Sequence, residues 1–198
     1  MWIWTNEVQP PTAGGVVPVQ ARPFVKVLHA NCSLDHVTVI MGCDNFCTLY
    51  VNGLVVGTEK NGASTNAQRY TVKFPPTHEV SIAVYAAQDP VTKLAIGLII
   101  SGVAWNSNQI KPIEIPFVTD SSWKTFAADD FDVRFIEPHF DVSDWSDALV
   151  LGAYGVSPWG SFAIPTTPTT QNGPLVAVTG LPDAPVAGPA NVITLNGQ

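Results

Sequence analysis

The sequence predicts an all-β fold, a jelly-roll β-sandwich of two antiparallel sheets that forms a single domain. Short runs rich in β-branched and aromatic residues recur along the chain, and 15 glycines and 17 prolines punctuate it. No long run combines helical periodicity with helix caps. A chain of 198 residues that is 46% hydrophobic can bury one core of this kind. Short strands without interleaved helices are typical of two sheets packed face to face.

The clearest strands lie in the first half of the chain. Residues 36–41 and 46–51 are expected to pair as a hairpin across the turn cluster at 42–45. Asn52-Gly53 follows directly and predicts a type I′ turn, because both residues tolerate a positive φ. Residues 54–57 then form the return strand, so three strands are expected to be joined locally.

Five further segments complete about eight predicted strands. Four of them show apolar alternation or partial alternation, and one is a nearly continuous apolar run with the β-branched content of a central strand. They are residues 70–74, 80–86, 94–100, 113–117 and 133–135. The pair Pro75-Pro76 is expected to end the first of them, because proline cannot donate a ladder hydrogen bond.

The ends of the chain differ from its middle in charge. We divide the sequence into an N-terminal apolar arm (1–19), a jelly-roll domain (20–163) and a proline-rich C-terminal extension (164–198) whose one charge is Asp183. Leaving Trp2 and Trp4 in water would be costly, at about 25 cal/mol per Å² of apolar surface. We therefore expect the ends to pack on the body or on a neighbouring subunit.

Composition excludes several classes of partner. Nine Lys and Arg against 16 Asp and Glu give a formal charge of −7, opposite to the basic surface that nucleic acids require. The longest uncharged apolar run in the middle of the chain, residues 94–105, is shorter than the roughly 20 residues of a membrane span. No signal peptide is visible at the start, so we expect a cytoplasmic or unconventionally exported protein.

The three cysteines are Cys32, Cys43 and Cys47. An odd number excludes a fully paired framework, and a core of this size does not need one. We therefore expect all three to be reduced and structural. A zinc site has little support, because the four histidines are scattered and provide no second ligand pair for Cys43 and Cys47.

Several motifs resemble the galactose-binding-like jelly-roll modules. They are the stretch from Asp44-Asn45 to Gly57 (DNFCTLYVNGLVVG), the turn TDSSWK at 119–124, the pair DWSDA and GVSPWG at 144–160, and the opening RPFVK at 22–26. The likeness covers residues 20–162 in the expected order. Such modules occur as accessory domains of glycoside hydrolases and as free-standing lectins, so the resemblance implies a sugar-binding protein whose partners are glycans or glycoproteins, with galactose as a candidate.

The residues of these motifs also have structural explanations. Asp44 and Asn45 are candidates for sugar contact, but an Asx turn explains them as well. Trp159 and the neighbouring Tyr154 form a further candidate pair, although tryptophans in such segments more often pack in a core. One scaffold hosts many ligands, so the function depends on the site.

Trp105 is the strongest candidate for a sugar contact. It ends an apolar strand and opens the polar loop Trp105-Asn106-Ser107-Asn108-Gln109. An indole offers stacking area for the C–H face of a pyranose, while Asn106 and Asn108 offer hydrogen bonds to its hydroxyls. The alternative is a solvated turn beside a core tryptophan.

Eight of the 16 acids fall between Asp120 and Asp147. Asp129, Asp130 and Asp132 could supply two or three oxygens to calcium, the one cofactor that we consider. A pair of carboxylates for glycoside hydrolysis is a second interpretation, and solvated loop charge is the third. Motifs for nucleophilic, zinc-dependent or nucleotide chemistry are absent from the sequence.

These observations predict a lectin without catalysis of its own. Lectins with shallow sites gain avidity by presenting several at once, so we expect a homo-oligomer. Two alternatives remain open: a structural or assembly protein without a sugar site, and a small polysaccharide-acting hydrolase that uses the acidic segment.

Overall fold

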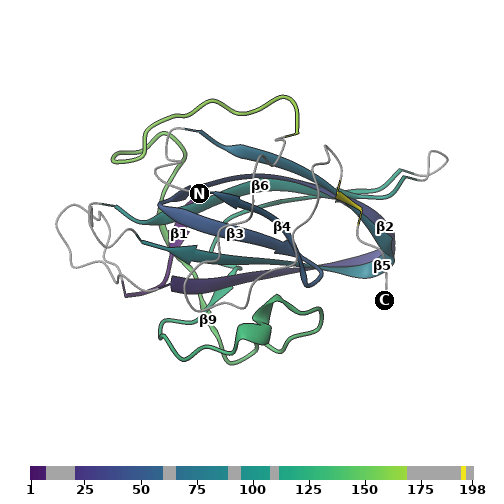
Figure 1. The fold of residues 1–198 in the computed structure, drawn as a ribbon, viewed down its shortest axis with the longest axis horizontal. Coiled ribbons are helices and arrows are strands. Elements are labelled where there is room, and N and C mark those ends of the chain that lie inside the picture. The colour runs from purple at the N-terminus through teal and green to yellow at the C-terminus, as the bar shows by residue number, and fades with distance from the viewer. Residues whose placement is uncertain (8–20, 60–65, 89–94, 108–111, 169–192, 195–198) are drawn as a thin grey trace.

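The chain folds as a β-sandwich in a computed structural model that describes residues 1–7, 21–59, 66–88, 95–107, 112–168 and 193–194 (Figure 1). Its strands are β1 (Trp2–Trp4), β2 (Ala21–Asp44), β3 (Phe46–Val51), β4 (Leu54–Glu59), β5 (Gln68–Ala87), β6 (Gly97–Trp105), β7 (Glu114–Val118), β8 (Lys124–Thr125), β9 (Ser146–Asp147), β10 (Leu149–Gly152) and β11 (Ile193–Thr194). One short 3-10 helix, η2, spans Val133–Ile136. The predicted all-β jelly roll is confirmed. In the described ranges, no helix has the length and apolar character that a membrane span requires.

The two layers share the long strands β2 and β5, which pair antiparallel along most of their length. The second half of β2 pairs with β6, and that layer continues through β1 to β10. The first half of β2 pairs with β8, while the second half of β5 pairs with β3, which leads to β4. Both strands therefore pass from one layer into the other, and hydrogen bonds join all the described strands into one sheet path.

The passage between the layers lies near residues 30–35 of β2 and 74–78 of β5, where the register shifts. Pro75 and Pro76 fall in this stretch and are exposed. The prediction that they end a strand is wrong: β5 continues through them, because the register shift leaves no ladder bond for their missing N–H groups to donate.

The predicted hairpin between residues 36–41 and 46–51 is also wrong. The end of β2 pairs with β6 in one layer, whereas β3 pairs with β4 and β5 in the other. The chain therefore changes layer at Asp44–Phe46 instead of turning back on itself. The apolar alternation of both segments is the same in either arrangement, so it could not distinguish them.

A disulfide bond joins Cys43 and Cys47 across this change of layer, and Cys32 is free. This corrects the expectation that all three cysteines are reduced. Both side chains of the pair are buried in the core, and their Cα atoms lie 6.2 Å apart, a separation that a disulfide spans. The tight connection between two layers brings them together, which the sequence interval alone did not indicate.

The predicted turn at Asn52-Gly53 is confirmed. Both residues have positive φ, 48° and 85°, and they connect β3 to the paired strand β4. Further along β4, a Cβ at Gly57 would lie 2.3 Å from the ring of Tyr70 on β5, so a larger residue there would have to displace that ring.

The main core lies between the two layers. One face of each strand supplies it, so that Val37, Val39 and Met41 of β2 are fully buried. Ile82 and Val84 of β5 face them in the same cluster. Burying each such side chain contributes about 1.5–3 kcal/mol to folding.

Two non-strand segments cover the outer faces of the layers, on opposite sides of the sandwich (Figure 1). The segment containing η2 places Phe135 in a cluster with Tyr50 and Tyr85. The predicted strand at 133–135 is therefore wrong: Asp132 caps η2 by accepting a hydrogen bond from the backbone N–H of Arg134. On the other face, Trp159 and Phe162 pack on Trp2.

The first residues of the chain are part of the body. Strand β1 lies between β6 and β10, and Trp2, Ile3 and Trp4 are fully buried. Residues 8–20, and those of 169–198 other than β11, lie outside the described residues.

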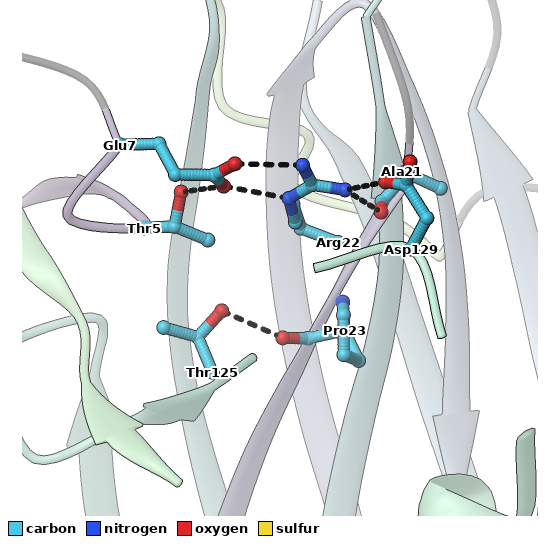
Figure 2. A network of polar contacts seen from close by, with 7 residues as sticks. All are labelled: Thr5, Glu7, Ala21, Arg22, Pro23, Thr125 and Asp129. Carbon is cyan, nitrogen blue, oxygen red and sulfur yellow. Dashed lines mark hydrogen bonds and ion pairs between the residues drawn. The ribbon is translucent and has the colours of Figure 1, made fainter. Parts of the chain in front are cut away.

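A buried arginine ties this N-terminal strand to β2 (Figure 2). Arg22 is 3% exposed and donates to both oxygens of Glu7 at 2.6 and 2.7 Å. A third bond, of 2.7 Å, runs to Asp129 in the covering segment. Burial alone would raise the pKa of Glu7, but the hydrogen bonds from Arg22 and Thr5 outweigh it and lower that pKa.

Removing either carboxylate should have unequal effects on stability. Glu7 is 25% exposed and Asp129 is 57% exposed. We expect Glu7→Gln to lower the free energy of unfolding by about 1–3 kcal/mol, because it leaves a buried charge partly uncompensated. Asp129→Asn should cost less than about 1 kcal/mol, since water screens the exposed pair. Urea unfolding of both variants checks the order, and equal losses would contradict it.

Candidate functional site

The structure separates the predicted site residues into two groups at opposite ends of the stretch where β2 pairs with β6. Asp44 pairs with Gly97 at one end of this strand pair, and His36 pairs with Trp105 at the other. The eight residue-to-residue steps from His36 to Asp44 span about 26 Å of extended chain. One small sugar therefore cannot touch both Trp105 and Asp44.

Asp44 and Asn45 sit at the change of layer between β2 and β3. Asp44 is 9% exposed, and burial raises the pKa of its carboxyl to about 6, although the nearby indole of Trp159 lowers it in part. The backbone N–H of Asn45 donates to the carbonyl of Ala87 at 3.3 Å. Asp44 is therefore packed against the covering loop, while the bond of Asn45 fixes the backbone at the change of layer.

Trp159 lies near Asp44, and both Trp159 and Tyr154 hold the covering segment in place. Trp159 is 7% exposed and stacks on Trp2 with ring centroids 4.6 Å apart. Tyr154 donates its hydroxyl to the carbonyl of Phe162 at 2.6 Å and accepts from the N–H of the same residue at 3.0 Å. Little of the Trp159 indole is left for a ligand.

Trp105 is half-buried on the outer face of its layer, at the end of β6. Its indole stacks on the imidazole of His36, with ring centroids 4.1 Å apart and planes inclined by 16°. His36 lies on the neighbouring strand β2, in register with Trp105. Residues paired in this way share a face of the sheet, so the two rings stand side by side on it.

Asp35 connects these rings to the loop that follows Trp105. Its Oδ1 accepts from His36 Nδ1 at 2.7 Å and from the Ser107 backbone N–H at 2.8 Å, and its Oδ2 accepts from the Ser107 hydroxyl at 2.5 Å. Burial opposes ionisation, but these bonds from Ser107 and His36 outweigh it and lower the pKa of Asp35. Asn106 also fixes the loop, because its Oδ1 accepts from the Ile113 N–H at 3.2 Å. Asn108 lies outside the described residues.

A row of paired residues crosses the same face of the sheet. Lys73 on β5 pairs with His36, and Glu114 on β7 pairs with Trp105. Lys73 and Glu114, the two ends of this row, are exposed. Sequence reasoning missed His36, Asp35 and Glu114, because strand pairing brings them close to Trp105. It placed Ser107 in the polar loop after Trp105 but did not foresee its bonds to Asp35. An Asp-His pair just before a strong strand is the one signal that the sequence offers.

The acidic segment forms ion pairs with arginines. Asp129 binds Arg22, while Asp132 binds Arg134 at 2.6 Å. Asp130 is exposed. Within the described ranges, no group of three or more His, Cys, Asp or Glu side chains is placed to hold a metal ion.

Glu59 is a buried carboxyl that sequence reasoning did not single out. It ends β4 in register with Cys47 and is 3% exposed. Burial raises its pKa to about 9, and the backbone N–H of Cys43 lowers it only in part. Glu59 is therefore protonated and neutral at neutral pH.

The pH dependence of stability should reveal this carboxyl. The pKa of Glu59 is about 9 in the folded state against an ordinary 4.5. The contribution of this carboxyl to the free energy of unfolding is therefore fully present below pH 4.5 and is lost as the pH rises to 9. Glu59→Gln should flatten the fall in unfolding free energy over this interval. The exposed Glu137→Gln serves as the control and should leave the wild-type slope. Chemical denaturation across the interval measures both, and an unchanged slope in Glu59→Gln would show that the carboxyl is not buried.

Comparison with known proteins finds similar structures among lectins and an enzyme that acts on a sugar. No protein-family model matches the sequence, and no curated protein matches it either. Among solved structures, a lectin from Pleurotus ostreatus in complex with GalNAc matches with a TM-score of 0.70 and 34% identity, over 83% of this chain and 46% of that one. Its apo form matches with a TM-score of 0.70 and 32% identity. The chain thus spans about half the length of these lectins.

A second kind of structure shares the fold alone. The α-L-rhamnosidase of Streptomyces avermitilis, complexed with L-rhamnose, matches with a TM-score of 0.63 and 24% identity, over 85% of this chain and 16% of that one. The fold, the confirmed Asn52-Gly53 turn and the motifs at 44–57 agree with these likenesses. The fold and these motifs are those of a galactose-binding-like jelly-roll module.

Proposed function

We propose that the protein is a carbohydrate-binding protein, a lectin that recognises galactose-type glycans. The observation that supports this class most is the 34% identity, over most of this chain, to a lectin captured with GalNAc. The rhamnosidase likeness adds support for the fold and none for the ligand. Glycans or glycoproteins are the proposed partners.

The proposed site is the surface around Trp105. A pyranose has an apolar face that an indole can stack on, and a ring of hydroxyls that carboxylates and amides can bind. Trp105 is half-buried, so it combines a fixed position with accessible ring area. Asn106, Asn108 and the exposed Glu114 are the proposed polar contacts. Asp44 and Trp159 are assigned to packing because both are buried, and Tyr154 because its hydroxyl is bonded within the covering loop. Asn45, beside Asp44, lies apart from the surface around Trp105.

We propose no catalysis for this chain. A hydrolase would need two facing carboxyls across a bound sugar. Two of the eight acids in the acidic segment, Asp129 and Asp132, are instead paired with arginines. Incubation with oligosaccharides and a search for cleaved products tests this point, and any product would favour the hydrolase alternative.

The proposal includes assembly into a homo-oligomer. A single shallow site binds weakly, and linked sites raise avidity by roughly 10² to 10⁴. Analytical ultracentrifugation should show a mass above that of one chain. A monomer at working concentration would contradict this part of the proposal.

Glycan-array binding tests the function directly. We expect signals concentrated on glycans that carry galactose or N-acetylgalactosamine. The same array with a calcium chelator tests the calcium interpretation of the acidic segment, since loss of signal would show a metal-dependent site. An array without signal would favour the structural or assembly alternative.

Replacing Trp105 should separate binding from folding. Trp105→Ala should abolish most glycan binding while leaving the melting temperature nearly unchanged, because the indole is only half-buried. Trp123→Ala is the matched control: that indole is fully buried, so its removal should cost about 3–5 kcal/mol of stability. A loss of several kcal/mol in Trp105→Ala would instead place its indole in the core.

A further inference from the structure

The position of Trp105 raises a physical problem for a sugar site. A side chain at the end of a strand has rotamer freedom, and ordering it on binding reduces affinity. A receptor whose aromatic ring is already held in place avoids that loss. The contacts of His36 and Asp35 meet this requirement.

His36 restrains the indole from one side. The two rings lie 4.1 Å apart and nearly parallel, so one face of the Trp105 indole is covered by imidazole. The strand order β2-β6-β7 directs the opposite face toward β7, where Glu114 is paired with Trp105. A ligand that stacks on Trp105 therefore approaches from the β7 side.

Asp35 in turn restrains His36. An ionised carboxylate only accepts hydrogen bonds, so the 2.7 Å contact places a proton on His36 Nδ1 and fixes the ring orientation. The same carboxylate takes both donors of Ser107, two residues beyond Trp105. Asp35, at the bend of β2, thereby restrains both the His36 ring and the loop that follows Trp105.

We infer that His36, oriented by Asp35, is a positioning residue for Trp105 in sugar binding. The inference rests on the proposed function, because it assigns His36 a role at the Trp105 surface. It limits the ligand to one face of the indole, the face beside Glu114. His36 itself need not touch the sugar.

The arrangement of the rings can be tested without a ligand. In a ¹H–¹⁵N spectrum, the indole N–H signal of Trp105 is identified by its loss in Trp105→Phe. We expect His36→Ala to shift and broaden this signal, because the ring current and the restraint disappear together. His36→Phe should keep the signal sharp, since a phenyl ring can stack in the same place. A signal unchanged in His36→Ala would overturn the inference.

Binding measurements complete the test, with the glycan that gives the strongest array signal as the probe. His36→Ala should raise its Kd about two- to tenfold, the effect of freeing one large side chain. His36→Phe should restore the wild-type Kd, and Asp35→Ala should resemble His36→Ala. The control His29→Ala removes an exposed histidine of the same strand and should leave Kd unchanged.

The possible results distinguish a failure of the positioning role from a failure of the proposed function. If Trp105→Ala abolishes binding while His36→Ala leaves Kd unchanged, the positioning role is wrong and the proposed function stands. If the wild type binds glycans but Trp105→Ala does not weaken that binding, the site is elsewhere and the inference is wrong. If no glycan binds, the proposed function fails, and the positioning role fails with it.

Discussion

The fold depends on the apolar layer enclosed between the two halves of β2 and β5. Each strand is long enough to contribute to both layers, and its apolar alternation keeps one face in the core on either side of the bend. The register shift near residues 30–35 is therefore a structural requirement, because a strand without it would leave one layer uncovered. The Cys43–Cys47 disulfide joins the two sides of the second change of layer, between β2 and β3. The Asn52-Gly53 turn then connects β3 to β4.

The outer faces of the sandwich differ in ways that bear on function. Covering segments pack on much of them: Phe135 lies over Tyr50 and Tyr85, and Trp159 lies over Trp2. The part of the outer face around His36 and Trp105 instead keeps half-buried rings between exposed Lys73 and Glu114. A sheet face that presents aromatic rings among charged groups suits a ligand with both an apolar face and hydroxyls. In the acidic segment 120–147, Asp129 anchors the covering loop to the body through its contact with the buried Arg22.

Sequence reasoning reached the fold class and part of the site. Asn52-Gly53 was predictable because the turn chemistry is local, and β7 was predictable because its residues alternate. The residues 133–135 alternate as well, yet they form a 3-10 helix, since Asp132 caps it and Phe135 packs on the outer face. Trp105 stood out by its place between an apolar run and a polar loop. His36 did not, because it lies 69 positions away in the printed sequence and only strand pairing makes it a neighbour.

The sequence by itself determined the strand-rich character, the alternation that places one face of each strand in the core, and the polar loop that follows Trp105. These follow from side-chain chemistry acting over a few residues. The tertiary structure decided which strands pair, that β2 and β5 each serve two layers, that Cys43 meets Cys47, and that Asp35 and His36 stand behind Trp105. Such contacts depend on register between segments far apart in the chain, and residue preferences within any one segment are compatible with more than one register.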